Sequence, residues 1–479
     1  MLSADVARPR YDRSQLRTGI VHLGLGAFHR AHQAIYTEDV LEGEFGPWGI
    51  AGVSLRSPDT RDALAPQGGL YAVAVRGAGG ERLRVVGAVT EVLVAPEDPC
   101  AVLERLCRPA VRIVTLTVTE KGYCHDPATG ALDEDHPGIR RDLADPGRPG
   151  TAPGFLVEAL DRRRRAGLQP FTVLSCDNLP SNGDTTAGIL RRLASLRDPA
   201  LGRWVEDAVA CPNSMVDRIV PATTPEDRDA VARRLGAEDA WPVVTEPFSQ
   251  WVIEDRFPSG RPAWERVGAE LVPDVRPYEL MKLRLLNGSH STLAYLGYLA
   301  GYDTVSQAMA DPAFARLVRG LMDEEVTPTL TVPPGADLDR YKAALIDRFA
   351  NPALRHRTWQ IAMDGSQKLP QRLLGTVRDR LAAGEPVDRL ALAVAAWMRY
   401  VAGRDERGGP IDVRDPLAGR LAALAAGAGG SAEALASALL GVREVFGDDL
   451  PVTPAFTAAV TAALDRLVRL GARRTVEGL

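Results

Sequence analysis

One short segment near the start of the chain limits the possible folds more than any other. Residues 20–23, Ile-Val-His-Leu, form a run typical of a strand buried on both faces of a sheet. Gly24-Leu25-Gly26 follows at once and precedes a helical stretch. Glycines there permit a tight turn and let the backbone approach a pyrophosphate at the start of a helix. The segment predicts a dinucleotide-binding turn. A purely structural turn is the alternative, because His29 replaces the third glycine of the usual pattern.

Three more short apolar runs continue this pattern, at residues 50–55, 112–118 and 171–175. A helical stretch around residues 155–165 lies between the last two. Strands that alternate with helices indicate a parallel sheet covered on both faces. The predicted fold class is therefore α/β, with a Rossmann-type parallel-sheet domain over residues 1–275.

The pattern changes from about residue 275 onward, where Ala, Leu and Arg dominate. One apolar stripe of helical spacing runs from Leu390 to Val401, and another runs from Pro454 to Gly471. These stripes predict a second, mainly α-helical domain over residues 276–479.

The end of the second strand bears on which dinucleotide would bind. The run continues through Leu55 and Arg56 to Asp59. A carboxylate in this region can bind the adenosine ribose and repel a 2′-phosphate, which favours NAD. Arg56 could instead accommodate the phosphate of NADP, so NADP remains possible.

A polar cluster interrupts an apolar stretch at residues 279–290. At about 100° per residue, Glu279, Lys282 and His290 share one face of a helix, and Asn287 lies on its flank. Oxidation of an alcohol needs a base for the hydroxyl proton, and a lysine can serve if burial lowers its pKa. An amide can stabilise the developing alkoxide. An exposed amphipathic helix with incidental polar residues is the alternative.

A second polar cluster, residues 175–183, begins where a parallel strand is expected to end. Open α/β sheets bind ligands at that edge. Asn178 is placed to supply a second amide donor, whereas Asn182-Gly183 is interpreted as a simple turn.

Composition narrows the range of partners. Lys and Arg number 57 against 62 Asp and Glu, giving a formal net charge of -5. This balance lacks the basic footprint of a nucleic-acid binder. No run approaches 18 apolar residues, so no membrane span is expected. We expect a small-molecule substrate, no nucleic-acid or membrane partner, and a monomer or weak oligomer.

Other features indicate the compartment and argue against a metal. The first 19 residues are polar and lack the apolar core of a secretion signal. The five cysteines are scattered and are expected to be reduced thiols, which indicates a cytoplasmic protein. The seven histidines show no metal-ligand spacing, so no metal site is predicted.

Seven motifs together resemble those of the polyol-specific long-chain dehydrogenases, the mannitol dehydrogenase family. In chain order they are GLGAFHRAHQA, LTVTEKGYC, SCDNLPSNG, PNSMVDRI, EPFSQWVIED, KLRLLNGSH and DGSQKLPQR. The resemblance extends from about Gly19 to Gly471. It implies a Rossmann-type domain, a mainly helical C-terminal domain and catalysis without a metal ion.

The resemblance also implies roles for single residues. Lys282 would be the general base, and Asn178 and Asn287 would form the oxyanion hole. His290 would orient the substrate, and Glu279 would exchange the proton with solvent. The other implied positions are Asp217 and Lys368 for substrate, and Gly24, Gly26, Phe28 and Asp59 for cofactor.

One departure from the family pattern bears on the substrate. In the mannitol enzymes an arginine that touches the substrate precedes the DGS-x-K segment, whereas Gln360 stands at that position here. The run WQIAMDGSQKLPQR looks more like the fructuronate reductase branch. D-mannonate/D-fructuronate and D-mannitol/D-fructose differ at one terminal carbon, which is a carboxylate or a hydroxymethyl group. A carboxylate favours a cationic partner, which Lys368 or Arg372 could supply.

The expected function is an NAD-dependent oxidoreductase that interconverts an alcohol and a ketone at C2 of D-mannonate/D-fructuronate. Mannitol 2-dehydrogenase, or an enzyme of another polyol such as arabinitol, is the alternative within the family. A phosphorylated substrate would need an added Arg/Lys cluster. A catalytically silent, dinucleotide-sensing protein is the alternative from another class, and intact Lys282, Asn287 and His290 argue against it.

Overall fold

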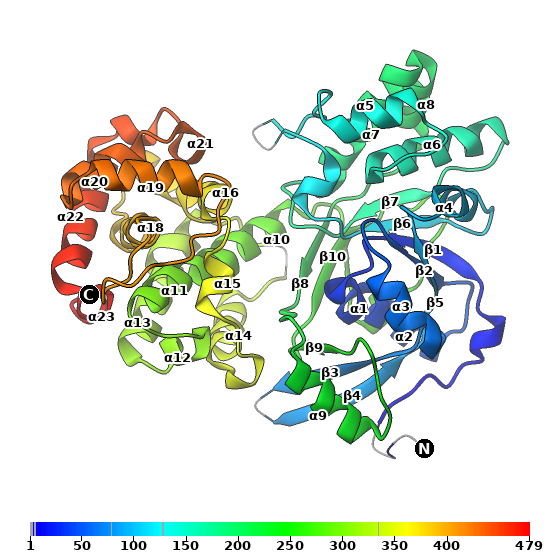
Figure 1. Ribbon diagram of the computed structural model, residues 1–479, viewed down its shortest axis with the longest axis horizontal. Helices are drawn as coiled ribbons and strands as arrows, with labels where there is room; N and C mark the ends of the chain where they lie inside the picture. Colours follow the sequence, from blue (N-terminus) through cyan, green and yellow to red (C-terminus); the bar gives the residue numbers. More distant parts are fainter. Residues whose placement is uncertain (1–2, 4–5, 78, 127–128, 334) are drawn as a thin grey trace. The chain divides into compact units, whose positions relative to one another are not determined.

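The computed structural model describes residues 3, 6–77, 79–126, 129–333 and 335–479. The chain divides into two compact units, one ending at Arg276 and the other beginning at Pro277 (Figure 1). The first unit contains every strand of the described sheets, and the second is helical.

A five-stranded parallel sheet organises the first unit. Its spatial order is β5 (Val89–Val94), β2 (Gly49–Ser54), β1 (Thr18–Leu23), β6 (Ile113–Leu116) and β7 (Thr172–Ser175). All four neighbouring pairs are parallel. Every residue of β2, β6 and β7 is buried, which explains why these strands are apolar runs without alternation. The predicted α/β fold class is confirmed.

Side chains of the sheet enter two separate hydrophobic cores. In β1, Ile20 packs into one core, whereas Val21 and Leu23 pack into the other. This alternation follows from the pleat, which points successive side chains to opposite faces. Figure 1 shows α4 to α8 above the sheet and α1 to α3 below it. The helices of this unit are α1 (Ala27–Ala31), α2 (Gln33–Gly43), α3 (Asp59–Leu64), α4 (Pro99–Leu106), α5 (Pro137–Ala144), α6 (Ala152–Arg165), α7 (Asn182–Arg197), α8 (Pro199–Ala208) and α9 (Pro225–Leu235), with the 3₁₀ segments η1 (Arg13–Gln15), η2 (Ala65–Gln67), η3 (Glu120–Tyr123) and η4 (Trp264–Val267).

Two three-stranded sheets extend this unit beyond what the sequence analysis anticipated. One has the order β4 (Gly80–Val86), β3 (Tyr71–Gly77), β9 (Val243–Thr245). The other has the order β11 (Glu270–Val272), β10 (Gln250–Glu254), β8 (Ser214–Asp217). In the second sheet β8 runs antiparallel to β10, and Asp217 is paired with Gln250.

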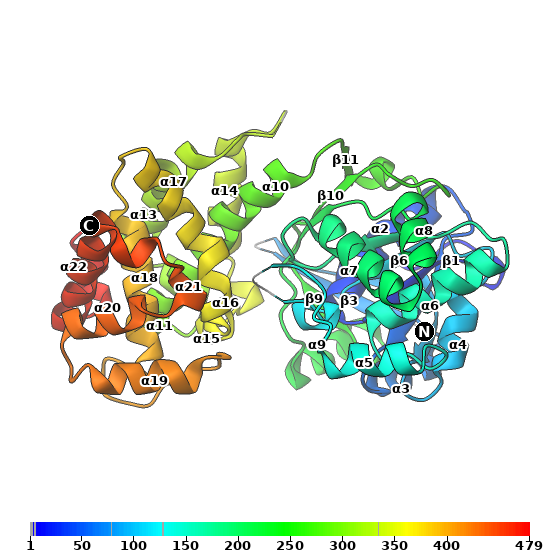
Figure 2. The same cartoon turned by 90° about the horizontal axis from the view of Figure 1, so that it is seen from above.

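The second unit is built around α18 (Asp388–Val401). Leu390, Val394, Trp397 and Val401, the stripe that the spacing identified, are all buried. Helices α11 (Gly288–Leu299), α19 (Ala418–Gly427), α20 (Ala432–Leu440) and α22 (Pro454–Leu470) contact α18, and Figures 1 and 2 show them surrounding it. The other elements are α10 (Arg276–Met281), α12 (Val305–Met309), α13 (Pro312–Gly320), α14 (Leu338–Ala350), α15 (Thr358–Ala362), α16 (Gly365–Leu369), α17 (Gly375–Ala382), α21 (Arg443–Phe446), α23 (Ala472–Glu477), the π-helical η5 (Lys282–Asn287), η6 (Leu321–Val326) and η9 (Pro370–Leu374), and the 3₁₀ segments η7 (Thr327–Thr329), η8 (Pro352–Leu354) and η10 (Leu450–Val452).

Within the described parts of the chain, no helix combines the length and apolar character needed to cross a bilayer.

Candidate functional site

The strand order of the large sheet places a ligand-binding edge beside β1. From β1 the chain continues to β2 and later β5 on one side, whereas β6 and β7 lie on the other. The direction of winding therefore reverses between β1 and β6. Open α/β sheets bind ligands outside the carboxyl ends of their strands at such a switch point. Gly24-Leu25-Gly26 leaves β1 at this edge.

The two glycines of this turn have different roles. Gly24 has φ +93°, and a Cβ atom there would lie 2.2 Å from the carbonyl oxygen of Thr117. Gly24 is thus required by its backbone conformation and by the close approach of the loop after β6. A Cβ at Gly26 would meet nothing nearer than 3.8 Å, so the space beside it is open to a ligand. This arrangement fits a pyrophosphate that approaches the backbone at Gly26.

A buried histidine of β1, His22, contacts the turn. His22 Nε2 lies 3.2 Å from the carbonyl oxygen of Gly24 and 2.9 Å from Thr117 Oγ1, and His22 Nδ1 lies 2.8 Å from Thr115 Oγ1. The ring of His29 stacks on His22 with centroids 3.5 Å apart. Burial lowers the pKa of His22 to about 3, so both His22 nitrogens serve as fixed hydrogen-bonding groups of a neutral ring.

His29 therefore fills the space that the third glycine would leave between helix and strand. The helix that follows the turn is short: α1 ends at Ala31, and His32 has φ −124° and ψ −88° before α2 begins. His32 Nε2 lies 2.9 Å from the carbonyl oxygen of Gln250. The continuous helix of the standard fingerprint is thus broken into two pieces.

The other predicted cofactor residues lie on neighbouring elements. Phe28 is partly buried on α1, where its ring stacks on His32 with centroids 5.1 Å apart. Asp59 is exposed at the start of α3, after β2, and accepts a hydrogen bond of 2.8 Å from the Ser57 hydroxyl. Arg56 is also exposed. An open glycine turn with an exposed carboxylate beyond the next strand fits a dinucleotide.

The loop after β7 carries Asn178, which is exposed. Its neighbour Asp177 fixes this loop by accepting hydrogen bonds from the backbone N–H groups of Val118 (2.9 Å) and Thr119 (3.0 Å) and from the Tyr123 hydroxyl (2.8 Å). Burial raises the pKa of Asp177 to about 6 against the lowering effect of these bonds. Asp177 thus ties the loops after β6 and β7 together, and Asn178 follows directly.

The interpretation of Asn182-Gly183 as a simple turn is wrong, because these residues begin α7. The Asn182 amide is buried and donates to the carbonyls of Ser175, Asp177 and Ser214. Asn182 therefore links the end of β7 to β8. Asp217, the last residue of β8, is also buried.

In the helical unit the predicted polar cluster is not on a regular α-helix. Glu279 lies half-buried on α10, Lys282 begins the π-helical η5, Asn287 ends it, and His290 lies on α11. A π-helix pairs residues i and i+5, so the spacing of 100° per residue does not apply across this segment. Lys282 and His290 are nevertheless both buried and close enough for the charge of the lysine to act on the imidazole. π-helical segments occur frequently at functional sites.

His290 has an environment rich in cations. Its ring packs on Phe349 (centroids 4.7 Å apart) and meets the ring of His356 at 5.1 Å and 90°. Burial lowers the pKa of His290 well below its ordinary value, and His356 and the charges of Arg348, Arg372 and Lys282 lower it further. Burial and the charge of Lys368 lower the pKa of His356 to about 4. Two neutral imidazoles thus lie among four cationic side chains.

The DGSQKLPQR segment contributes two of these cations. Lys368 Nζ donates to the carbonyls of Met363 (2.5 Å) and Ile361 (3.3 Å), and Arg372 Nη1 donates to Ser291 Oγ (3.2 Å). A Cβ at Gly288 would lie 2.9 Å from the carbonyl oxygen of Arg372, so this glycine permits α11 to approach η9.

Gln360, on α15, is exposed and is not among the groups around His290. The sequence analysis did not single out Arg348 or His356. Arg348 lies on α14, and His356 lies between η8 and α15. The basic run Arg355-His356-Arg357 was the available signal.

Among the residues that the structure describes, no three His, Cys, Asp or Glu side chains are grouped so as to hold a metal ion.

Comparisons with known proteins agree on one family. The model of the mannitol dehydrogenase Rossmann domain matches residues 18–266, and that of the mannitol dehydrogenase C-terminal domain matches residues 274–468. The chain is 50% identical to the D-mannonate oxidoreductase of Escherichia coli (strain K12), over 99% of this chain and 98% of that protein. It is 43% identical to a mannitol 2-dehydrogenase of Phaeosphaeria nodorum, over 98% and 83%.

A solved structure gives the same result. The Pseudomonas fluorescens mannitol 2-dehydrogenase, in a ternary complex with NAD and D-mannitol, is 43% identical and superposes with a TM-score of 0.92, covering 100% of this chain and 97% of that one. Both domain models and relatives that match over nearly their whole length lead to one conclusion: the chain belongs to the mannitol dehydrogenase family of oxidoreductases.

Proposed function

We propose that this chain is an NAD-dependent oxidoreductase that interconverts a secondary alcohol and a ketone at C2 of a linear sugar acid, the pair D-mannonate/D-fructuronate. The observation that carries the proposal is the cationic environment of His290, in which Lys282, Arg348 and Arg372 all lower the pKa of one buried imidazole. A fourth cation, Lys368, acts on the neighbouring His356. Cationic side chains gathered around these two imidazoles suit a substrate with a carboxylate.

The general base of the proposal is Lys282. The lysine is buried at the start of η5, and its amine, once it has lost its own proton, can take the proton of the substrate hydroxyl. NAD, when bound, supplies the acceptor for the hydride. Glu279, half-buried three positions before Lys282, is assigned the exchange of that proton with solvent.

The amides of Asn178 and Asn287 are assigned the role of hydrogen-bond donors to the alkoxide that develops at C2. Asn178 is fixed in its unit by the Asp177 network, and Asn287 is fixed as the last residue of η5. Rigid donors stabilise charge in the transition state without reorganisation. His290, neutral and held between Phe349 and His356, is assigned the orientation of substrate hydroxyls, and buried Asp217 is assigned a further substrate contact.

The cofactor assignment depends on the turn after β1 and on Asp59. Gly24, Gly26 and Phe28 would hold the pyrophosphate side of NAD, and Asp59 would bind the adenosine ribose. The relative of known structure carries NAD, which supports the same assignment here. Arg56 leaves NADP as the second cofactor to test.

D-mannitol/D-fructose is the second candidate substrate pair, favoured by the mannitol 2-dehydrogenases that are 43% identical to this chain. The 50% identity to a D-mannonate oxidoreductase supports the sugar acid. Gln360 replaces an arginine of the mannitol enzymes, which sets this chain apart from them, but a glutamine provides no cation for a carboxylate. We therefore assign the binding of the substrate carboxylate to Arg348, Lys368 and Arg372.

The direct test is kcat/KM for fructuronate and for fructose with NADH, followed at 340 nm. We expect fructuronate to be preferred by roughly 30-fold or more, since a charge-paired carboxylate lost on going to fructose costs on the order of 2–5 kcal/mol. Equal efficiency, or better activity with fructose, would reject the sugar acid and leave the polyol as substrate.

A further inference from the structure

The segment that carries Lys282 is fixed from its other side by an arginine. Arg284 lies two positions after Lys282 in η5, and side chains two positions apart on a helix do not face each other. The Arg284 side chain is only 8% exposed, and its Nη1 forms an ion pair of 2.6 Å with Asp379 Oδ2 of α17. Nη1 also donates to Thr329 of η7, to Oγ1 at 2.7 Å and to the carbonyl oxygen at 3.2 Å.

A π-helical segment needs such external support. π-helices are rare and appear mostly as short interruptions of α-helices. η5 contacts η6 and η9, which are also π-helical. The Arg284 contacts add a polar attachment to α17 and η7, on the side away from Lys282.

We propose that the ion pair of Arg284 with Asp379 is a positioning device that holds η5, and so the amine of Lys282, in its catalytic geometry. The inference rests on the proposed role of Lys282 as the base. Neither Arg284 nor Asp379 touches the reacting atoms in this proposal. A displacement of about 1 Å in a catalytic group can cost about 10²-fold in rate, so a small shift of η5 is sufficient to reduce turnover.

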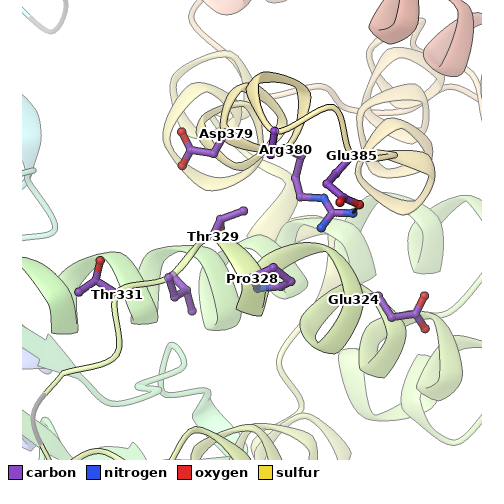
Figure 3. Close-up of a pocket in the computed structure, with 9 residues that line it drawn as sticks. Glu324, Pro328, Thr329, Thr331, Asp379, Arg380 and Glu385 are labelled. Carbon is purple, nitrogen blue, oxygen red and sulfur yellow. Dashed lines mark ion pairs between the residues drawn. The ribbon is translucent and has the colours of Figure 1, made fainter.

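The surroundings of Asp379 allow this residue to be substituted without disturbing the packing. Asp379 and Thr329 line a cavity of about 690 Å³ in the helical unit (Figure 3). The Asp379 side chain is 52% exposed, so exchange of one carboxylate oxygen for an amide nitrogen causes no crowding. Thr329 still binds Arg284 in that variant, which favours folding with a weakened attachment.

The neighbouring residue of α17 offers a matched control. Arg378 forms an ion pair of 2.6 Å with Asp449, whose side chain is 56% exposed. Asp379→Asn and Asp449→Asn thus break ion pairs of equal length whose carboxylates are similarly exposed, although Arg378 is 35% exposed against 8% for Arg284, and only the first pair involves η5.

The experiment compares Asp379→Asn, Arg284→Lys and Asp449→Asn in the full-length enzyme. For each variant, kcat and KM are measured with whichever of fructuronate and fructose the wild type prefers. The dissociation constant of NADH is measured by fluorescence, and Tm is measured by calorimetry. We expect Asp379→Asn to lower kcat by about tenfold and Arg284→Lys by up to about 10²-fold, with KM and NADH binding within about twofold of the wild type. Asp449→Asn should retain the wild-type kcat with a similar change in Tm.

Two outcomes separate the inference from the proposal beneath it. If Asp379→Asn and Asp449→Asn have the same kcat while Lys282→Met is inactive, the positioning role is rejected and the base assignment remains. If Lys282→Met stays active, the assignment of Lys282 as base fails, and the positioning role that rests on it fails as well. Should Arg284→Lys fail to fold, the comparison of the two aspartate variants still decides the question.

Discussion

The rings of His290 and His356 lie 5.1 Å apart and are perpendicular to each other. Both pKa values are lowered, mainly by burial, and the charges of Arg348, Arg372, Lys282 and Lys368 act in the same direction. The pair therefore adds no positive charge near neutral pH, and the positive charges that act on it come from lysines and arginines. Removing one of these cations at a time therefore tests whether the enzyme recognises a negative charge on its substrate.

Arg348→Met should reduce activity on a carboxylate substrate selectively. Methionine keeps an unbranched chain but removes the charge that acts on His290. We expect kcat/KM for fructuronate to fall by roughly 30-fold or more, and kcat/KM for fructose to change little. Arg340→Met, on the exposed face of the same α14, is the matched control. Equal losses on both substrates would show that Arg348 supports the fold or the uncharged part of the substrate.

Lys282→Met should abolish turnover and leave NADH binding intact, because the proposed cofactor residues all lie in the first unit. Loss of a positioned base costs about 10²–10⁴-fold. Lys342→Met is the control, since this lysine pairs with Asp323 (2.6 Å) and Asp339 (3.0 Å) and has no proposed catalytic role. More than about a tenth of wild-type activity in Lys282→Met would contradict the assignment.

Asn178→Ala and Asn287→Ala should each lower kcat by about 10²-fold if each supplies one donor to the alkoxide. Asn182→Ala, at the start of α7 just after the loop that carries Asn178, provides a contrast. Its amide bonds three backbone carbonyls, so its loss should lower Tm. Steady-state kinetics and thermal unfolding separate the two roles. An effect of Asn178→Ala or Asn287→Ala on KM alone would limit that residue to binding the ground state.

The parts of the fold that the sequence predicted are those governed by local pattern. β1, β2, β6 and β7 appeared as apolar runs because both faces of each strand are buried. The turn at Gly24 was predictable because a positive φ next to a neighbouring loop demands glycine. The stripe of α18 was predictable because every turn of that helix is buried.

What could not be predicted depends on contacts between distant segments. η5 is attached through Arg284 to Asp379, far along the chain, and no local feature of KLRLLN predicts a π-helix. Asn182 looked like a turn residue because its partner Ser214 lies in a later strand. The cations around His290 come from α14, η9 and η5, which the sequence alone gave no means to bring together.

Asp59→Ala should narrow the preference for NAD over NADP. The exposed carboxylate at the start of α3 would repel a 2′-phosphate, and alanine removes that repulsion. Asp62→Ala is the matched control, because Asp62 is an exposed carboxylate on the same helix with no proposed cofactor contact. Asp62 pairs with Arg61 at 2.7 Å. The ratio of kcat/KM for the two cofactors is the measurement. An unchanged ratio in Asp59→Ala would transfer cofactor selection to Arg56 or to another residue.

The stacked pair of His22 and His29 makes the stability of the protein dependent on pH. Burial lowers the pKa of His29 well below its ordinary value, and the nearby His22, His32 and Arg30 lower it further. In the unfolded chain a histidine titrates near 6.5. As the pH falls below about 6.5, the unfolded state takes up a proton that native His29 does not, so the free energy of unfolding decreases.

His29→Phe removes this contribution and keeps a ring to pack on His22. We expect the difference in Tm between pH 7.5 and pH 5.5 to be smaller in His29→Phe than in the wild type. The missing contribution is at most about 1.4 kcal/mol for each pH unit below 6.5. Any packing cost of the larger ring is the same at both pH values and cancels in the difference. His22 is present in both proteins, so its own contribution to the pH dependence cancels as well. An identical pH dependence in the two proteins would mean that native His29 takes up a proton in this range, and would contradict the stacking of a neutral His29 on His22.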